Sequence, residues 1–227
     1  MKRFWADVTV TPDAGIALDG KPVGTPGRVP LILPTPALAE AVAQEWRAVE
    51  SEIDPRAMPL TGLANAAIDR IVPDPARFAA GLAAYAESDL LCYRADSPAE
   101  LVARQAAAWD PLLDWARATY GVEFVVTTGI MHQPQPPATL AALRQAITAQ
   151  SPFALAALSP IVTISGSLVA ALALAEGAAG AEAVWLAAEL DAEWQAEQWG
   201  EDDLAAPARQ ARRRDFDAGV QLLGLLH

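Results

Sequence analysis

The first 35 residues alternate between apolar and polar positions, which is the period-two pattern of half-buried β-strands. Apolar side chains occupy every second position over residues 4–10, and a second apolar run covers Ile16–Leu18. The Asp19-Gly20 pair, between that run and Val23, is typical of a tight hairpin turn. A further strand is expected over residues 29–33. The pattern therefore predicts a small β-rich start to the chain.

The period of the apolar positions changes from two to 3.6 after Pro34. Thr35-Pro36 is a typical helix start, and it is followed by an amphipathic stripe of Leu38, Val42, Trp46 and Val49. Further along, Ser97-Pro98 with Glu100 is expected to form a capping box that has proline at the first helical position. Asp110-Pro111 is expected to restart or kink that helix. Most of the chain after residue 35 is therefore predicted to be helical.

One more short strand is expected over residues 122–128, followed by a proline-rich linker and a helix over residues 140–149. Residues 151–175 carry no charge and are numerous enough to span a bilayer. However, Ser159-Pro160 interrupts this stretch, polar residues crowd its centre, and neither flank carries the Lys or Arg expected beside a membrane span. Two buried core helices, or one helix with an interrupted middle, are the better interpretation.

The net charge of −12 argues against nucleic acid and anionic membranes as partners, because both would be repelled over most of the surface. The charge is uneven: no Lys or Arg lies between Arg144 and Arg209, while nine carboxylates lie between Glu176 and Asp203. A basic or polar partner surface would suit that region. The short basic run of Arg209 and residues 212–214 most simply complements the acidic segment before it.

Few residues offer catalytic or metal-binding chemistry. Cys92 is the one cysteine, and His132 and His227 are the two histidines, so neither a disulfide framework nor a tetrahedral zinc site is expected. Cys92 follows an apolar run and is expected to pack in the core, whereas His132 is expected in an exposed loop. Residues 15–21 match a phosphate-binding loop except that Pro22 stands where Ser or Thr is required, so a hairpin turn is the better interpretation.

The helix predicted over residues 181–200 places acidic and apolar side chains side by side. Its stripe of glutamates consists of Glu182, Glu189, Glu193 and Glu197, and the apolar neighbours are Trp185, Leu186 and Leu190. Carboxylates one helical turn apart repel each other by about 0.2–0.5 kcal/mol per pair, so another part of the fold must compensate. The stripe is either a solvated face or an acidic and aromatic docking surface.

Several short phrases follow one another along the chain. They are residues 18–26 (LDGKPVGTP), Glu45-Trp46, residues 53–55 (IDP), 58–61 (MPLT) and 89–94 (DLLCYR), Trp109-Asp110-Pro111, Tyr120-Gly121 and residues 190–200. In this order they resemble the ATP synthase assembly chaperone family that binds the alpha subunit of the F-type ATPase catalytic head. The resemblance covers nearly the whole chain.

The resemblance implies an α+β fold of two parts. A small N-terminal β-rich α/β two-layer domain would cover residues 1–58, and a C-terminal orthogonal helical bundle would cover residues 59–227. The implied function is that of an assembly chaperone without enzymatic activity, cofactor or small-molecule substrate. Its partner would be the free alpha subunit, whose subunit interface it shields until the beta subunit replaces it.

The location follows from the same resemblance. Eukaryotic relatives carry a presequence and act in the mitochondrial matrix, whereas this chain begins directly on its first predicted strand. A bacterial, cytoplasmic member is therefore expected, with no nucleic acid partner and no stable insertion into a membrane.

The resemblance also implies partner-binding residues. The tryptophan that matters in the family corresponds to Trp46, and the acidic position of the late helix corresponds to Glu193, with Glu189 as its neighbour. The late segment further contributes Trp194, Gln195 and Trp199. Because Trp46 lies on an apolar stripe, its loss is expected to act through folding, whereas the loss of Glu193 is expected to act through binding.

Two other classes stay open at this point. One is a small-ligand-binding protein or enzyme that uses a pocket between the two domains, with His132 or Cys92 as its reactive group. The other is a membrane-associated assembly factor that uses residues 151–175.

Overall fold

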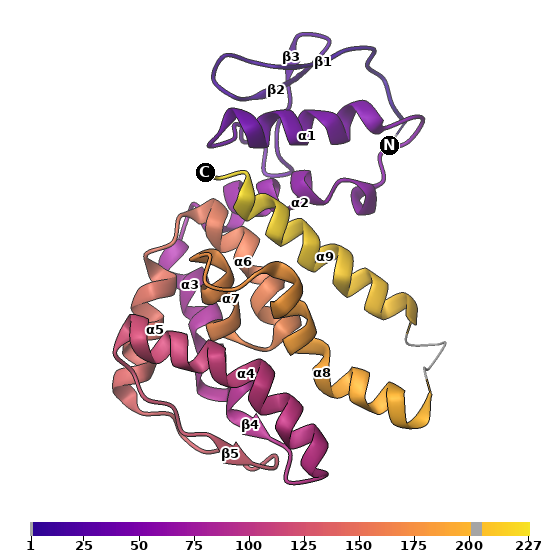
Figure 1. The fold of residues 1–227 in the computed structure, drawn as a ribbon. Helices are drawn as coiled ribbons and strands as arrows, with labels where there is room; N and C mark the ends of the chain where they lie inside the picture. The colour runs from indigo at the N-terminus through magenta and orange to yellow at the C-terminus, as the bar shows by residue number, and fades with distance from the viewer. Residues whose placement is uncertain (1, 201–205) are drawn as a thin grey trace. The chain divides into compact units, whose positions relative to one another are not determined.

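The computed structural model describes residues 2–200 and 206–227. Its strands are β1 (Val8–Val10), β2 (Ile16–Leu18), β3 (Lys21–Pro22), β4 (Tyr93–Arg94) and β5 (Thr127–Thr128). Its α-helices, shown in Figure 1, are α1 (Pro36–Ala48), α2 (Pro59–Ala66), α3 (Pro75–Ala83), α4 (Ala99–Tyr120), α5 (Pro137–Thr148), α6 (Pro152–Ser165), α7 (Leu168–Ala175), α8 (Ala181–Trp199) and α9 (Ala206–Gly224). The predicted α+β class is confirmed, with helices predominating over two small sheets.

Shorter helical segments connect these elements. They are the 3₁₀ segments Pro55–Ala57, Ala84–Ser88 and Leu90–Cys92, and the π-helical segment Ala67–Ile71, which continues α2.

Contacts group the described residues into two compact units. Unit 1 draws on Met1–Pro75, Ser151–Leu158 and Asp217–His227, and unit 2 on Ala76–Gln150 and Ser159–Phe216. Compactness does not measure independent folding, so the domain boundary at residue 58 stays a prediction, as does the orthogonal packing of a bundle over residues 59–227.

The β1, β2 and β3 strands of unit 1 form an antiparallel sheet in which Leu18 pairs with Val8 on one side and with Lys21 on the other. The turn between β2 and β3 is Asp19-Gly20, with positive φ angles of 48° and 75°, as a tight hairpin turn of the primed type requires. The Asp19 carboxylate accepts the backbone N–H groups of Ala6 and Asp7 at 3.0 and 2.8 Å, so it ties the turn to the preceding segment. The hairpin interpretation of residues 15–21 is confirmed.

The α1 helix covers one face of this sheet (Figure 1). It begins as predicted, because the Thr35 side chain accepts the N–H of Leu38 at 3.1 Å and Pro36 occupies the first turn. Its apolar stripe is buried, including Leu38, Val42 and Trp46. The Trp46 ring meets the ring of Trp5 edge to face at 5.3 Å between centroids. The amphipathic helix inferred from the 3.6-residue period is therefore confirmed.

One of the predicted strands does not form, and another is shorter than expected. Residues 29–33 form no strand and make two isolated bridges, Gly15 to Ile32 and Gly24 to Pro30, because Pro30 lacks the N–H that a continuous ladder needs. The strand expected over residues 122–128 is limited to β5. The Gln135 side chain explains this, since it both accepts the N–H of Val125 and donates to its carbonyl, which occupies groups that a neighbouring strand would pair.

The capping box predicted before α4 is wrong. Ser97 donates its hydroxyl hydrogen bond to Asp96, and Pro98, with an extended ψ of 164°, is the residue that precedes the first helical position. The helix therefore starts one residue later than predicted and its N-cap has no side-chain hydrogen bond. The α4 helix also continues through Pro111 as one element, so the restart predicted as one outcome at Asp110-Pro111 does not occur, while the kink predicted as the other outcome stays a prediction.

The uncharged residues 151–175 form two helices, α6 and α7, in agreement with the first of the two interpretations. The interruption predicted at Ser159-Pro160 is wrong, because α6 continues through Pro160 as one element. Gly166, with a φ of 66°, ends the first helix, and Ser167 caps the second by accepting the N–H of Ala170 at 2.9 Å. The α7 helix is buried over its first six residues. Within residues 2–200 and 206–227, no helix combines the length and apolar character needed to cross a membrane.

Candidate functional site

The acidic helix α8 forms as predicted, from Ala181 to Trp199. It carries five carboxylates and no Lys or Arg. Three further members of the acidic segment, at positions 201–203, lie outside the described residues. A helix of this composition needs cations from elsewhere in the fold to offset the repulsion among its carboxylates.

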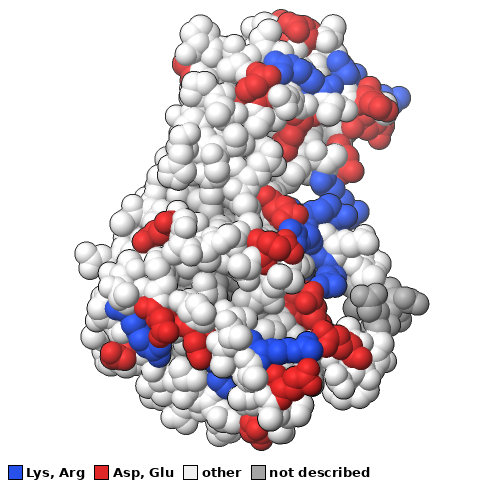
Figure 2. Space-filling model, in the orientation of Figure 1, with Lys and Arg blue, Asp and Glu red and all other residues white. Residues whose placement is uncertain are grey.

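The basic run on α9 supplies most of those cations, as the sequence predicted. Arg213 lies 2.7 Å from Glu182, Arg212 lies 2.6 Å from Glu189, and Arg209 bonds to both Glu189 and Glu193. Basic and acidic side chains consequently alternate on this part of unit 2, as the face drawn in Figure 2 shows.

The remaining glutamate of the stripe is paired from another helix. Arg104 of α4 contacts Glu197 through both carboxylate oxygens, at 2.9 and 2.8 Å, and also bonds to Glu100 at 3.0 Å. The hydrogen bonds to Glu197 raise the pKa of the Arg104 guanidinium, so the guanidinium stays positively charged. The same guanidinium lies over the ring of Trp194, 4.8 Å from its centroid.

Accessibility separates the three central glutamates. The side chain of Glu189 is 5% exposed and is held by two guanidinium groups, which gives it the position of a packing residue between α8 and α9. The Glu193 and Glu197 side chains are 38% and 51% exposed, so a partner can reach them. The stripe is thus neither uniformly solvated nor uniformly available for docking.

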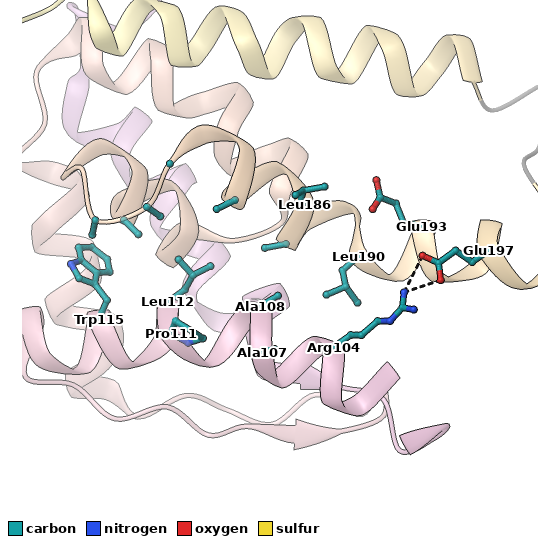
Figure 3. A pocket seen from close by; sticks show the side chains of 16 residues that line it. Arg104, Ala107, Ala108, Pro111, Leu112, Trp115, Leu186, Leu190, Glu193 and Glu197 are labelled. Carbon is teal, nitrogen blue, oxygen red and sulfur yellow. Dashed lines mark hydrogen bonds and ion pairs between the residues drawn. The ribbon is translucent and has the colours of Figure 1, made fainter. Parts of the chain in front are cut away.

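An apolar groove of about 750 Å³ lies between α4 and α8 (Figure 3). The α4 wall consists of Arg104, Ala107, Ala108, Pro111, Leu112 and Trp115, and the α8 wall consists of Ala183, Leu186, Ala187, Leu190, Glu193 and Glu197. Ala173 and residues 178–180 complete the lining. Arg104 reaches Glu197 across one end of the groove, as the dashed lines in Figure 3 show, so charged groups lie at that end and apolar groups along the rest.

Two hydrogen bonds, one buried and one partly buried, fix the distance between the groove walls. The Trp109 indole donates to the carbonyl of Ala187 at 2.8 Å, and the Gln105 amide donates to Asp191 at 2.7 Å. Gln105 also accepts the N–H of Ala95 at 2.8 Å, so its buried side chain is well satisfied. Trp109 and Gln105 of α4 therefore do more than pack in the core, because their hydrogen bonds position the groove.

Within unit 2, the predicted partner-binding residues of α8 do not share one face. Glu193 lines the groove, while Trp194 is buried beneath Arg104. Gln195 and Trp199 are exposed, Trp199 at 79%, but Gln195 is turned about 200° around the helix axis from Glu193. Trp46 belongs to unit 1, where it is buried.

Sequence reasoning missed the α4 wall of the groove. No sequence pattern marked Ala107, Ala108 and Pro111 as groove residues. Alanine is common at any position of a helix, and proline is usually interpreted as a helix start or break. Leu186 and Leu190 did give one, since apolar residues within a stripe of glutamates predict a face that is neither core nor solvent.

The two candidate reactive groups lie outside the groove. Cys92 is fully buried, and burial raises the pKa of its thiol to about 12, which disfavours the nucleophilic thiolate at neutral pH. His132 is exposed in a loop, with its Nδ1 3.1 Å from the hydroxyl of Tyr93. Both placements agree with the sequence interpretation. In the part of the chain that the structure describes, no set of three His, Cys, Asp or Glu side chains is arranged to hold a metal ion.

Another carboxylate that the sequence did not single out is completely buried in unit 2. Asp89 accepts the N–H of Leu91 at 3.2 Å and the N–H of Val169, at the start of α7, at 3.1 Å. Burial raises the pKa of Asp89 to about 6, against the opposing effect of these hydrogen bonds. The DLLCYR phrase thus contains a buried carboxylate that caps a core helix.

The fold and the groove define the class as an α+β protein whose preformed groove is lined by helices and edged by carboxylates. A family model described as ATP12 chaperone protein matches residues 2–117. The chain belongs to this family, as the resemblance of its sequence phrases indicated.

Solved structures of relatives cover the full length of this chain. Atp12 from Paracoccus denitrificans is 41% identical with a TM-score of 0.91, and a point mutant of Atp12p from that organism is 42% identical with a TM-score of 0.92. In both comparisons the match covers 100% of this chain and 98% of the other. The Atu1473 protein of Agrobacterium tumefaciens is 43% identical with a TM-score of 0.93, and the match covers 86% of that chain.

Proposed function

We propose that this protein is an assembly chaperone of the F-type ATP synthase that binds the free alpha subunit of the catalytic head. It shields the subunit interface of alpha until the beta subunit takes its place. The supporting observation is that Glu193, which the resemblance assigns to the family's acidic position, edges an apolar groove and stays 38% exposed. Membership in a chaperone family, with relatives matched over the whole chain, supports the assembly role.

The physical logic follows from the state of an unassembled subunit. An alpha subunit without its neighbours exposes apolar interface, and apolar patches of that kind cause aggregation. A chaperone must cover such a patch and then release it. An apolar groove supplies the cover, while exposed carboxylates at its edge supply polar contacts that water or a competing subunit can replace.

Binding, not catalysis, is the role we assign. The Cys92 thiol is buried with a pKa of about 12, and His132 has Tyr93 as its hydrogen-bonding neighbour in an exposed loop. Neither group lines the groove. No specific observation therefore favours the small-ligand enzyme over the chaperone.

Co-expression with the alpha subunit of the same organism tests the proposal. We expect a stable complex of one chaperone and one alpha subunit on size exclusion, and we expect added beta subunit to release the chaperone as alpha and beta associate. The beta subunit incubated alone with the chaperone is the control and should give no complex. An alpha subunit that stays aggregated or elutes separately in the presence of the chaperone would refute the proposed function.

A further inference from the structure

The apolar lining and the charged end of the groove between α4 and α8 suit one particular kind of binding segment. We propose that it holds a basic amphipathic helix of the alpha subunit, with apolar side chains against the alanines and leucines and a Lys or Arg at the end near Glu193 and Glu197. This inference rests on the proposed function, and it names what the site recognises.

The size of the lining side chains is the first argument. Alanine is the commonest lining residue, at seven of sixteen positions, and each wall also carries larger apolar groups, among them Leu112, Leu186 and Leu190. Small residues let another helix approach closely, while the leucines offer contact to side chains that recur at every third or fourth position. Leu186 is 46% exposed, so it offers apolar surface at the rim for a partner to cover.

The rigidity of the walls is the second argument. The bonds from Trp109 to Ala187 and from Gln105 to Asp191 hold α4 and α8 together beside the groove. A groove that is already formed does not lose conformational freedom when it is filled, so more of the contact energy appears as affinity.

Charge selects among the possible occupants. The α8 wall belongs to a helix with five carboxylates and no basic residue, and α4 carries three carboxylates against two arginines. The lining carboxylates Glu193 and Glu197 pair with Arg209 and Arg104, but their side chains stay 38% and 51% exposed, so a basic side chain of a partner can still reach them. A basic segment would find carboxylates of the opposite sign, whereas a second copy of this chain, with its net charge of −12, would be repelled.

A photo-cross-linking experiment identifies the occupant directly. Benzoylphenylalanine is placed at Leu186 on the groove rim or, as a control, at Gln145 on the exposed face of α5, and each variant is irradiated with purified alpha subunit. We expect the Leu186 variant to cross-link to one apolar alpha-subunit peptide that contains Lys or Arg, and the Gln145 variant to give little product. A cross-link to a second chaperone molecule, or to an acidic peptide, would overturn the inference.

Filling the groove gives an independent measurement. Ala183 is exposed and lines the groove, and Ala141 is an exposed alanine of α5 that serves as the matched site. We expect Ala183→Trp to weaken binding of the alpha subunit by about tenfold or more, because the added ring occupies the space of the partner's side chains, and Ala141→Trp to bind as the wild type does. Both variants should melt within a few degrees of the wild type.

The outcomes separate this inference from the proposed function. If wild-type protein binds alpha and Ala183→Trp binds equally well, with no cross-link at Leu186, the groove is not the binding site. The proposed chaperone function would stand in that case. If wild-type protein fails to bind alpha, the proposed function and this inference both fail. If a small apolar molecule copurifies in the groove and blocks the cross-link to alpha, the groove is a ligand site and the inference is refuted.

Discussion

Two glutamates of α8 allow the docking hypothesis to be tested one residue at a time. Glu193 and Glu182 are both partly exposed and both paired with an arginine of α9, but Glu193 lines the groove and Glu182 does not. We expect Glu193→Lys to weaken capture of the alpha subunit by about tenfold or more, because it reverses a charge at the binding surface. Its thermal midpoint should change little, since exposed ion pairs contribute about 0–1 kcal/mol.

Glu182→Lys is the matched control for that substitution. It breaks a comparable pair with Arg213 and changes the net charge equally, so it should leave capture close to the wild-type level. Affinity measured by titration calorimetry and stability measured by thermal melting distinguish the two effects. If Glu193→Lys lost as much stability as binding, Glu193 would have a packing role instead of a docking role.

Trp46 calls for the opposite result. Its side chain is buried and packs edge to face on Trp5, so Trp46→Arg would place a charge in the core of unit 1. We expect a loss of at least about 3 kcal/mol in the free energy of unfolding, measured in urea. Trp199→Arg is the control, because that ring is 79% exposed, and it should change stability by less than about 0.5 kcal/mol. A Trp46→Arg protein that folds cooperatively and fails to bind would contradict the folding explanation.

Asp89 predicts a dependence of stability on pH. Burial raises the pKa of Asp89 from 3.8 in the unfolded chain to about 6 in the folded protein, so between these values the folded state holds more protons. The stability from this group is therefore fully present below about pH 4 and is lost as the pH rises through about 6.

Comparison with Asp89→Asn isolates that contribution from the other carboxylates. The unfolding free energy of the wild type minus that of the variant should fall as the pH is raised from about 4 to about 7. Urea unfolding at three or four pH values measures the difference. A difference independent of pH would mean that Asp89 keeps its charge throughout the range despite its burial.

At the scale of elements, the attachment of α9 to α8 depends on a buried carboxylate. Glu189 has Arg209 and Arg212 as its partners, and removal of both would leave a buried negative charge without compensation. We expect the Arg209→Ala, Arg212→Ala double variant to lose about 3 kcal/mol of stability and to exchange the amide protons of residues 206–216 faster. Arg214→Ala, at an exposed position of the same helix, should change neither property. Unchanged exchange in the double variant would show that α9 is held by apolar packing alone.

The elements were predictable where one local signal decided them. The Asp19-Gly20 turn and the Thr35 cap needed no information from distant residues, whereas the local signal Ser159-Pro160 failed because α6 continues through Pro160. The strand over residues 122–128 failed because Gln135, ten residues beyond Val125, occupies its backbone groups. Hydrophobic alternation contains no information about such a competitor.

At the scale of the whole molecule, the candidate site was only half predictable. The acidic and apolar face of α8 follows from helical spacing, and its arginine partners follow from the charge pattern. The groove does not, because its second wall comes from α4, about 80 residues earlier in the chain, and that pairing depends on tertiary contacts such as the bond from Trp109 to Ala187. Glu189 also shows that a stripe of like residues need not have one role, since packing of α9 buries one member and leaves its neighbours exposed.

The net charge of −12 predicts how the molecule finds a basic segment. Long-range attraction acts before contact and is screened beyond about 10 Å at 0.1 M salt, whereas apolar contacts within the groove are not screened. Raising the salt concentration from about 20 to about 300 mM should therefore slow association with the alpha subunit by about tenfold or more and change dissociation much less. Stopped-flow mixing measures both rates, with sucrose added at constant salt as a control for viscosity. If higher salt left the association rate constant and made dissociation faster, the charges would act within the bound complex. The charge of the whole surface would then have no role in steering association.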